Sequence, residues 1–445
     1  MTQRSNTLPD ALRPVCSEEP SGTLTPKPSS LVSRSPIYYG WIILIAAGIG
    51  MIMSSPGQTY SVSIFIEHFI ADLGLTRSTV STLYTIGTLT ASFALPFIGR
   101  QIDRRGPRVM VGFITVGLAI ACVYMGFVQN AVMLGVGFVF IRMLGQGGMT
   151  IISSNVINHW WVRRRGAVLS LVGVVIGLLG SGSFPSLIQA LITRFGWRTS
   201  YMLLGLLVAV VMLPVGLFFF RRAPEDYGLL PDGAKPVSAQ DIGAPVFVEE
   251  NWTRSQALHT WVFWIIGLGG ACISMLGTGL QFHMVSIFDD ASLSAEAAAA
   301  AFMTIAISGA GVRLIAGVLS DRVPIRFLLS AGLVGQTVTL LMAPRLSDTT
   351  SALIYGIAMG ITSGLAMTVS AVVWAKYFGR RHLGAITGVS ALIGAAGSAL
   401  GPMPMGIARD LFGSYTLALA VLAALPAVLS VVVLFARRPH KARGA

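Results

Sequence analysis

The amino-acid sequence predicts an all-α membrane protein with twelve transmembrane helices arranged as two parallel halves of six. Only 11% of the 445 residues are charged, whereas 54% are hydrophobic, and a soluble domain carries about 25% charged residues. Apolar runs of about 20 residues, the length that spans ~30 Å of hydrocarbon, recur along the chain. Motifs of the first half also return in the second, a period typical of a membrane protein built from two repeats with a ligand bound between them.

The repeat is visible in individual residues. Gly99, Asp103 and Arg104 recur as Gly317, Asp321 and Arg322, at an offset of 218 residues. A second set keeps an offset of 217 residues: Arg163-Arg164, Gly177, Gly180-Ser181, Pro185 and Phe195-Gly196 return as Arg380-Arg381, Gly394, Gly397-Ser398, Pro402 and Phe412-Gly413.

The predicted spans lie near residues 39–66, 79–99, 107–128, 131–156, 166–190, 199–220, 259–287, 296–319, 325–344, 350–374, 383–408 and 414–436. They divide into an N-terminal half, 36–221, and a C-terminal half, 259–437. The polar, proline-containing stretch 222–258 is predicted to be a cytoplasmic linker. Residues 1–35 lack the apolar core of a signal peptide and are predicted to be a disordered cytoplasmic tail, with a second tail at 438–445.

Basic residues predict the orientation. With the N-terminus inside, the outer loops carry only five of the 31 Lys and Arg, namely Arg77, Arg194, Arg198, Arg345 and Arg409. The positive-inside rule then places both termini in the cytoplasm of a plasma, or inner, membrane. The net charge of +13 sits in short loops between apolar runs, which argues against nucleic acid as a partner. The three cysteines are far apart, and neither a metal site nor a cofactor is expected.

A conformational latch is predicted at the cytoplasmic end of spans two and three. Its residues are Gly99, Asp103, Arg104, Gly106 and Arg108, with Asp321 and Arg322 in the second half. The motif is expected in a loop, where Gly99 would let two helix ends approach and Asp103 would pair with an arginine or a helix N-terminus. A charged loop that only sets topology is the alternative.

This repeated loop motif, in a layout of six plus six spans, resembles the major facilitator superfamily. Arg142 on span four, followed by Gly145, Gly147 and Gly148, resembles a second signature of that superfamily. The resemblance covers roughly residues 39–436 and implies the fold, but one fold hosts many cargoes.

A finer resemblance is to the monocarboxylate transporter and oxalate/formate exchanger branch. It rests on Tyr39-Gly40-Trp41, on the Pro56-Gly57 break in span one, and on Trp160-Trp161 at the entrance of span five. Arg313 resembles the branch's substrate-binding arginine. The animal carriers also place a lysine on span one and an aspartate four residues before that arginine. This chain has no lysine on span one and Gly309 in place of the aspartate, so proton coupling by that pair is not expected.

Arg142 and Arg313 are the charges predicted to lie in mid-span, and no acid accompanies them. An ionisable residue at that depth is costly and indicates function. Because a carboxylate satisfies a guanidinium bidentately, the cargo is expected to be a small anion. We predict substrate contact for Arg313, with helix packing as the alternative. Arg142 is predicted mainly to gate, to relay protons or to bond to broken helix ends.

Polar residues on several spans complete the predicted site. Gln58 and Tyr60 follow the Pro56-Gly57 break, Tyr84 lies on span two, Asn155 on span four and Ser308 on span eight. His283 on span seven is a candidate proton carrier, with a position at the outer rim as the alternative. On span ten, Ser363, Met367, Ser370 and Trp374 fall on one helix face, a pattern that packing alone also explains.

The sequence therefore favours a secondary active transporter for a small organic anion, with a monocarboxylate favoured, that works by alternating access. Anion exchange and proton symport both stay open, so a proton or a counter-anion is the expected second partner beside the lipid bilayer. The alternatives are a drug or hydrophobic-solute exporter and a non-transporting membrane sensor. No nucleophile–base pair indicates an enzyme, and one chain holding both halves is expected to work as a monomer.

Overall fold

The computed structural model describes residues 32, 34–161, 165–233, 252–379 and 383–439. Every regular element in this part of the chain is a helix, which confirms the predicted all-α class. Nearly all of the predicted N-terminal tail, about half of the linker (234–251) and the end of the C-terminal tail lie outside the described residues.

The number of membrane-spanning helices agrees with the prediction. Eleven segments of the described chain are long and apolar enough to cross a membrane, and one of them, Leu171–Phe219, has 49 residues. A straight helix of that length would measure about 75 Å, more than twice the hydrocarbon thickness. Gly196 interrupts it with non-helical dihedrals, φ 75° and ψ 162°, so this segment contains predicted spans five and six.

The N-terminal half contains eight α-helices and two π-helical stretches. They are α2 (Gly40–Met53), α3 (Thr59–Leu73), α4 (Arg77–Arg105), α5 (Pro107–Gly126), α6 (Ala131–Ile141), the π-helix Arg142–Met149, α7 (Thr150–Trp160), α8 (Arg165–Ile176), the π-helix Gly177–Gly182 and α9 (Ser183–Phe219). Span one is divided, because a short 3₁₀ turn at Ser55–Gly57 separates α2 from α3.

The C-terminal half follows the short helix α10 (Arg254–Leu258). It contains α11 (Trp261–Phe282), α12 (Met284–Asp290), α13 (Ala295–Arg322), α14 (Ile325–Met342), α15 (Thr349–Phe378), α16 (Leu383–Leu400), α17 (Pro402–Phe412) and α18 (Thr416–Val433). Gly413 ends α17 at φ 66°, and it is the repeat partner of Gly196. The repeated Phe-Gly pair therefore makes the turn before the last span of each half, where a positive φ favours glycine.

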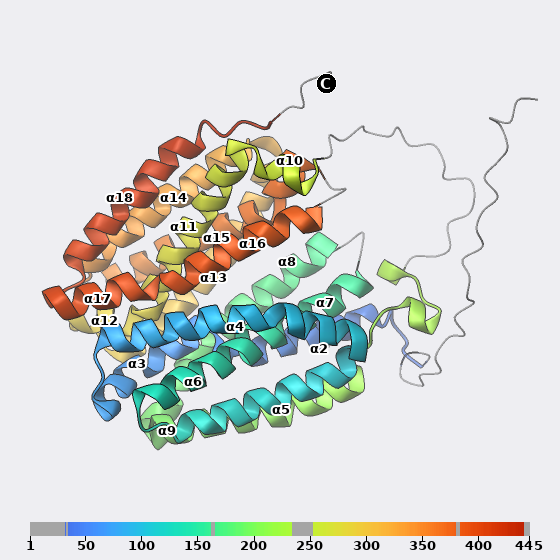
Figure 1. The fold of residues 1–445 in the computed structure, drawn as a ribbon, viewed down its shortest axis with the longest axis horizontal. Coiled ribbons are helices and arrows are strands. Elements are labelled where there is room, and N and C mark those ends of the chain that lie inside the picture. The colour runs from blue at the N-terminus through green and yellow to red at the C-terminus, as the bar shows by residue number, and fades with distance from the viewer. Residues whose placement is uncertain (1–31, 33, 162–164, 234–251, 380–382, 440–445) are drawn as a thin grey trace, which may run out of the picture.

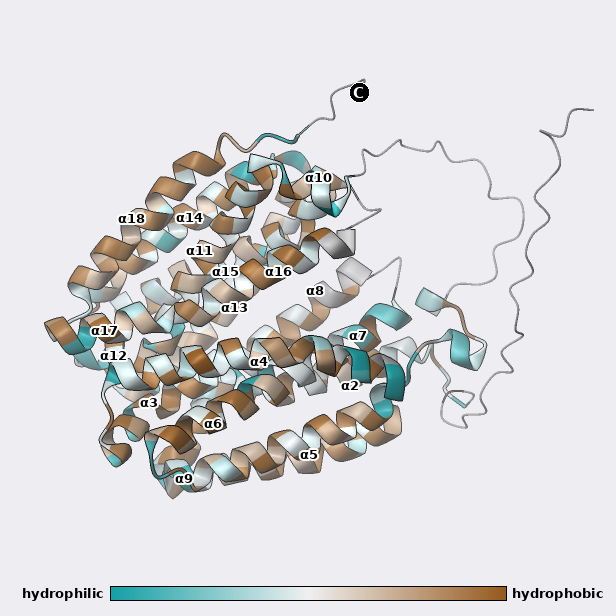
Figure 2. Ribbon diagram, in the orientation of Figure 1, coloured by the Kyte–Doolittle hydropathy of each residue, from teal (hydrophilic) through white to brown (hydrophobic). Residues whose placement is uncertain are grey.

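The two halves lie side by side and meet at one end (Figure 1). The ends of α3, α12 and α17 come together there, whereas α4 and α16 diverge toward the end that carries the linker. Apolar residues run along the helices, and hydrophilic ones gather at the end of α4 near the start of α5 (Figure 2). Large apolar side chains cover the outside, among them Phe93 at 84% exposed and Val132 at 75%, as expected for a surface that faces lipid.

One local prediction was wrong. The Gly99–Arg104 motif is not in a loop, because α4 continues without interruption to Arg105 and α5 begins at Pro107. Gly106, at φ 83°, supplies the one-residue turn between them. The second copy behaves alike, since α13 runs through Gly317 to Arg322. The predicted latch therefore occupies the last turns of two long helices.

Candidate functional site

The centre of the N-terminal half is a contact between the break in span one and the π-helix of span four. A Cβ on Gly145 would lie 3.0 Å from the Cα of Gly57, and a Cβ on Gly57 would collide with the carbonyl oxygen of Ile141. Only glycine allows the two backbones to approach this closely. π-helical turns are rare and often mark functional sites, and this one begins at Arg142.

Arg142 is buried at 2% exposure and holds this contact together. Its Nη1 donates to the carbonyl oxygen of Gly57 at 2.9 Å, and its Nε donates to the Thr88 hydroxyl at 3.0 Å. Its guanidinium carbon lies 4.8 Å from the centre of the Tyr84 ring. Bonds to a broken helix end were among the roles predicted for this arginine. Its Nη2, however, is buried and has no partner among the described residues.

A cavity of about 330 Å³ lies between the two halves, and Arg142 lines it. The N-terminal half contributes Thr88, Gln146 and Thr150 to its wall, and the C-terminal half contributes Ser274, Gly394 and Ser398. The Thr150 hydroxyl is, like Arg142 Nη2, buried without a partner. Two residues that line one cavity thus each carry a buried donor without a partner, which is costly unless a ligand or water accepts from it.

A second cavity of about 550 Å³ opens within the C-terminal half, between α11, α14, α15 and α16. It shares Ser274 and Gly394 with the first, so the two adjoin. The face predicted on span ten lines it, with Ser363, Met367, Ser370 and Trp374 all in the wall. Among the described residues that line the two cavities, Arg142 alone is charged.

Arg313 lies on α13 beside these cavities and lines neither of them. Its Nη1 donates to the carbonyl oxygen of Gly173 on α8 at 3.2 Å, a bond between the two halves. Its Nη2 lies 2.6 Å from the sulfur of Met367, which does line the larger cavity. The Nε has no partner among the described residues.

Some of the polar residues predicted around the arginines lie close to Arg142. The Tyr84 hydroxyl is 2.7 Å from that of Thr59, just beyond the break in span one. Tyr60 bonds to Ser55 at 2.9 Å, and Gln58 donates to Ser54 at 3.0 Å. Tyr84, Tyr60 and Gln58 therefore stabilise the break in span one, and none of them lines either cavity.

Asn155 and Ser308 also lie outside the walls of the two cavities. Asn155 is half-buried on α7. The Ser308 hydroxyl donates to the carbonyl oxygen of Thr304 in its own helix at 2.7 Å. Sequence reasoning missed Thr88 and Thr150, because a threonine inside a helix normally bonds to the preceding turn and gives no signal of its own.

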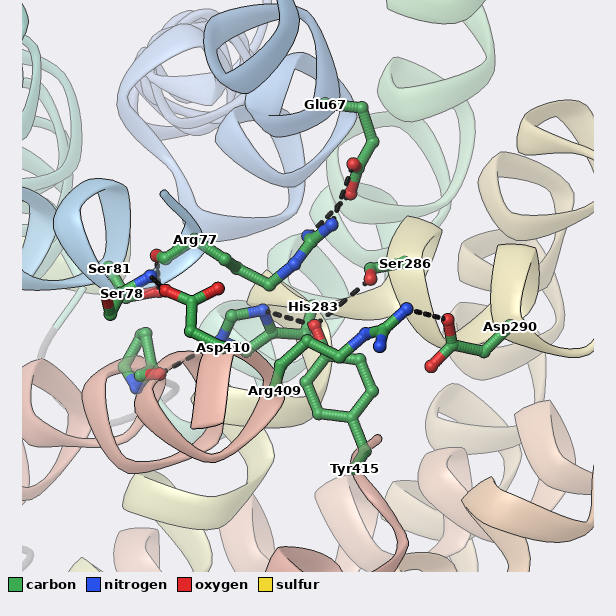
Figure 3. Close-up of polar contacts among 11 residues, drawn as sticks. Glu67, Arg77, Ser78, Ser81, His283, Ser286, Asp290, Arg409, Asp410 and Tyr415 are labelled. Atoms are coloured by element: carbon green, nitrogen blue, oxygen red, sulfur yellow. Dashed lines mark hydrogen bonds and ion pairs between the residues drawn. The ribbon is translucent and has the colours of Figure 1, made fainter. Parts of the chain in front are cut away.

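His283 lies between α11 and α12, at the end where the halves meet (Figure 3). Its Nε2 is 2.9 Å from the carbonyl oxygen of Pro402, and its Nδ1 is 3.1 Å from the Tyr415 hydroxyl. Both ring nitrogens are thus engaged inside the C-terminal half, away from the two cavities. The position of His283 matches the predicted alternative, in which this histidine lies at the outer rim and not beside the cargo.

Around His283 a charged cluster closes this end of the molecule (Figure 3). Arg77 pairs with Glu67 at 2.6 Å, and Arg409 pairs with Asp290 at 2.7 Å. Burial raises the pKa of the Asp290 carboxyl, and the nearby guanidinium of Arg409 opposes that shift. Each of these ion pairs lies within one half.

Among the described residues, three hydrogen bonds cross between the halves at this end. The Asp410 carboxylate accepts from the backbone N–H of Ser78 at 2.7 Å. A residue of the C-terminal half therefore caps the start of α4 in the N-terminal half. Thr85 donates to the carbonyl oxygen of Ala399 at 2.9 Å, and Gln189 donates to Glu296 at 3.3 Å. In the orientation predicted from the basic residues this end faces outside, and we therefore call these six residues the outer gate.

The predicted latch lies at the opposite end. A Cβ on Gly99 or on Gly317 would meet no atom within 4 Å, so neither glycine makes the close helix approach expected of it in this conformation. Arg104, Arg108 and Arg322 are exposed. The side chains of Asp103 and Asp321 lie outside the described residues. The latch role stays a prediction.

Comparisons with known proteins agree with the fold and with the resemblance stated from the sequence. The profile of the Major Facilitator Superfamily matches residues 47–402 and 316–445. Monocarboxylate transporter 13 of Rattus norvegicus is 23% identical over 395 residues, which are 86% of this chain and 85% of that protein. The oxalate:formate antiporter of Oxalobacter formigenes is 23% identical over 290 residues, 64% of each protein.

A similar solved structure is that of a bacterial homolog of the human lysosomal transporter Spinster, in an inward-facing and occupied conformation. It matches with a TM-score of 0.65 and 16% identity, over 89% of this chain and 97% of that one. At this identity the likeness concerns the fold.

Proposed function

The chain belongs to the major facilitator superfamily, and we propose that it is a secondary transporter that moves a small organic anion, with a monocarboxylate favoured, by alternating access. The names of its relatives support an anionic cargo, since they describe a monocarboxylate carrier and an oxalate:formate antiporter. In this proposal the anion binds between the halves, which rock around it.

The unpartnered Nη2 of Arg142 carries the proposal. Two of the arginine's donors hold the frame through Gly57 and Thr88, whereas the third is left without an acceptor at a cavity between the halves. An uncompensated buried charge is strongly destabilising. A carboxylate would supply both the missing negative charge and the missing acceptor, and the Thr150 hydroxyl would complete its shell.

The conformation supports alternating access. The outer gate joins the halves at one end, whereas α4 and α16 diverge toward the other (Figure 1). The linker lies at the divergent end, so the predicted orientation makes this a state open to the cytoplasm of a cell with the protein in its plasma, or inner, membrane. Opening would break the three bonds of the outer gate, and closure would bring the predicted latch together.

Arg313 keeps its predicted role as a second contact. Its bond to Gly173 joins the halves near the cavities, and its Nε has no acceptor among the described residues and can donate to a new partner. When the halves rock, a carboxylate can replace the carbonyl oxygen of Gly173. Anion exchange is the coupling we favour over proton symport, because no acidic residue lines the described walls of the two cavities.

The test is binding and uptake of small carboxylates by purified protein in proteoliposomes. Arg142→Gln is expected to abolish saturable uptake of acetate or formate, and Thr150→Val to weaken binding about three- to tenfold, as for one lost hydrogen bond. Thr337→Val is the matched control, because that hydroxyl bonds to Leu333 in its own helix and lines neither cavity.

Arg142 also holds the frame, so each variant is first checked for a single symmetric peak on size exclusion. Thr150→Val keeps the proposal testable if Arg142→Gln does not fold, since the Thr150 hydroxyl bonds to no protein group. Folded variants at both positions that bind carboxylates with wild-type affinity would overturn the anion site.

A further inference from the structure

The larger cavity has a chemistry that the anion site does not explain. It lies next to the cavity of Arg142, and Ser274 and Gly394 belong to both walls. An anion held by Arg142 would therefore extend any further atoms toward the C-terminal half. The volume of about 550 Å³ lies within the ~300–1,000 Å³ range of small-molecule sites, which is far more than a two-carbon acid needs.

Three unpartnered polar side chains line this cavity. Gln281 comes from α11, Ser370 from α15 and Ser390 from α16, and none of the three hydrogen-bonds to another described residue. Other hydroxyls of the wall are already engaged. Ser363, for instance, donates to the carbonyl oxygen of Gly360 at 3.0 Å, and Ser274 donates to that of Gly394 at 3.1 Å. Ser370 and Ser390 lie near the start of α11, where Gly267 approaches Trp374 and Ile393. Gln281 lies at the far end of α11, about 21 Å of helix beyond Gly267, so the two serines can share one ligand without it.

These side chains determine which class of ligand the cavity can bind. A hydrocarbon tail would displace water from Ser370 and Ser390 without replacing its hydrogen bonds, which disfavours an aliphatic acid. A second carboxylate would find no cation, because the described residues of this wall carry no charge and a buried unpaired charge is unstable. Neutral hydroxyl groups on the ligand, which donate and accept, would satisfy both serine side chains.

We propose that the cargo is a hydroxylated monocarboxylate of about six carbons, held with its carboxylate at Arg142 and its hydroxyl-bearing chain at the end of the larger cavity that Ser370 and Ser390 line. This inference rests on the proposed anion site. It adds the chemical class of the part of the cargo that extends beyond its carboxylate. Size alone favours a ligand that occupies both cavities, and polarity selects an aldonate over a fatty acid of equal length.

The test compares three probes of matched size by thermal shift and by calorimetry on the purified full chain. D-gluconate carries the carboxylate and the hydroxyls, hexanoate carries only the carboxylate, and D-glucitol carries only the hydroxyls. We expect D-gluconate to stabilise the protein at concentrations at which hexanoate and D-glucitol do not. Hexanoate binding as tightly as D-gluconate would overturn the hydroxyl site and leave the anion function intact.

Variants separate the two parts of the site. Ser370→Ala and Ser390→Ala are each expected to weaken D-gluconate binding about three- to tenfold, and to leave acetate binding unchanged. Ser430→Ala is the matched control, since this serine bonds to Ala427 in its own helix and lies outside both cavities. Loss of acetate binding in the serine variants, or D-gluconate binding unaffected by both, would refute the assignment. D-glucitol binding as well as D-gluconate would count against the carboxylate anchor itself.

Discussion

Arg142 donates from Nη1 to the carbonyl oxygen of Gly57 at 2.9 Å, so a buried cation on span four satisfies a backbone group that the broken helix of span one leaves open. Inside a bilayer such a group must find a partner within the protein. One guanidinium therefore serves two purposes, because two donors hold the frame and the third stays without a partner at the cavity. Any shift of the break in span one would move the proposed anion site.

The close packing at Gly57 leads to a first prediction. Gly57→Ala places a methyl group against the carbonyl oxygen of Ile141, and overpacking of this kind costs about 1–3 kcal/mol. We expect a lower melting temperature and weaker carboxylate binding. Gly48→Ala, in the same span, is the control, since its Cβ would meet no atom within 4 Å. Equal melting temperatures for the two variants would show that the contact is not tight.

A second prediction concerns the outer gate. Asp410→Ala removes the cap that the C-terminal half places on Ser78, and a hydrogen bond to a charged group contributes about 1.5–3 kcal/mol. The outward-open state should therefore gain at least about tenfold in population. In a Thr85→Cys background, labelling by a membrane-impermeant maleimide from outside should accelerate by a similar factor.

The control for the gate is another helix cap. Asp348 accepts from the backbone N–H of Ser351 at 2.7 Å, which lowers the pKa of its carboxyl, and this bond stays within the C-terminal half. Asp348→Ala should leave the labelling rate unchanged. A rate that rises equally in both variants would point to general loosening and against a gate at Asp410.

Most of the fold could be predicted from hydropathy and the repeat, because each span needs an apolar run and each run is visible. The ends of the helices were less predictable. Span two was expected to end near Gly99, where polar residues begin, yet α4 continues to Arg105. Helical hydrogen bonds do not require apolar side chains, so the helix ends only where Gly106 adopts a positive φ and Pro107 follows.

For the candidate site, the sequence predicted only the sign of the charge on the cargo. Mid-span arginines without acids indicated an anion, but whether a donor is free depends on its neighbours in space. The sequence favoured substrate contact for Arg313 and a gating role for Arg142. The fold leaves Nη2 of Arg142 without a partner in a residue that lines a cavity, and turns Nη1 of Arg313 toward Gly173. The face of Ser363, Ser370 and Trp374 was recognised, but a helical stripe does not reveal whether it faces a cavity or a packed helix.

A third prediction tests Arg313. If it contacts the cargo, Arg313→Gln should abolish saturable uptake in proteoliposomes while the folded protein remains monodisperse. Gly173→Ala, whose Cβ would lie 3.2 Å from Nη1 of Arg313, should disturb the contact between the halves and leave the guanidinium available. Uptake by Arg313→Gln at unchanged affinity would assign this arginine to helix packing alone.

The last prediction concerns the latch. A Cβ on Gly99 or Gly317 meets nothing within 4 Å in this conformation, and alanine is a better helix former than glycine by about 1 kcal/mol. Gly99→Ala and Gly317→Ala should therefore keep or raise the melting temperature. If these helix ends close against each other in the opposite state, the added methyl groups clash there at a cost of about 1–3 kcal/mol, and the rate of exchange should fall about tenfold. Gly311→Ala is the control, because it lies on α13 in equally open space but outside the repeated motif. Wild-type exchange rates in both latch variants would mean that the glycines recur for a reason other than close approach, and the latch would then have to depend on its charged residues.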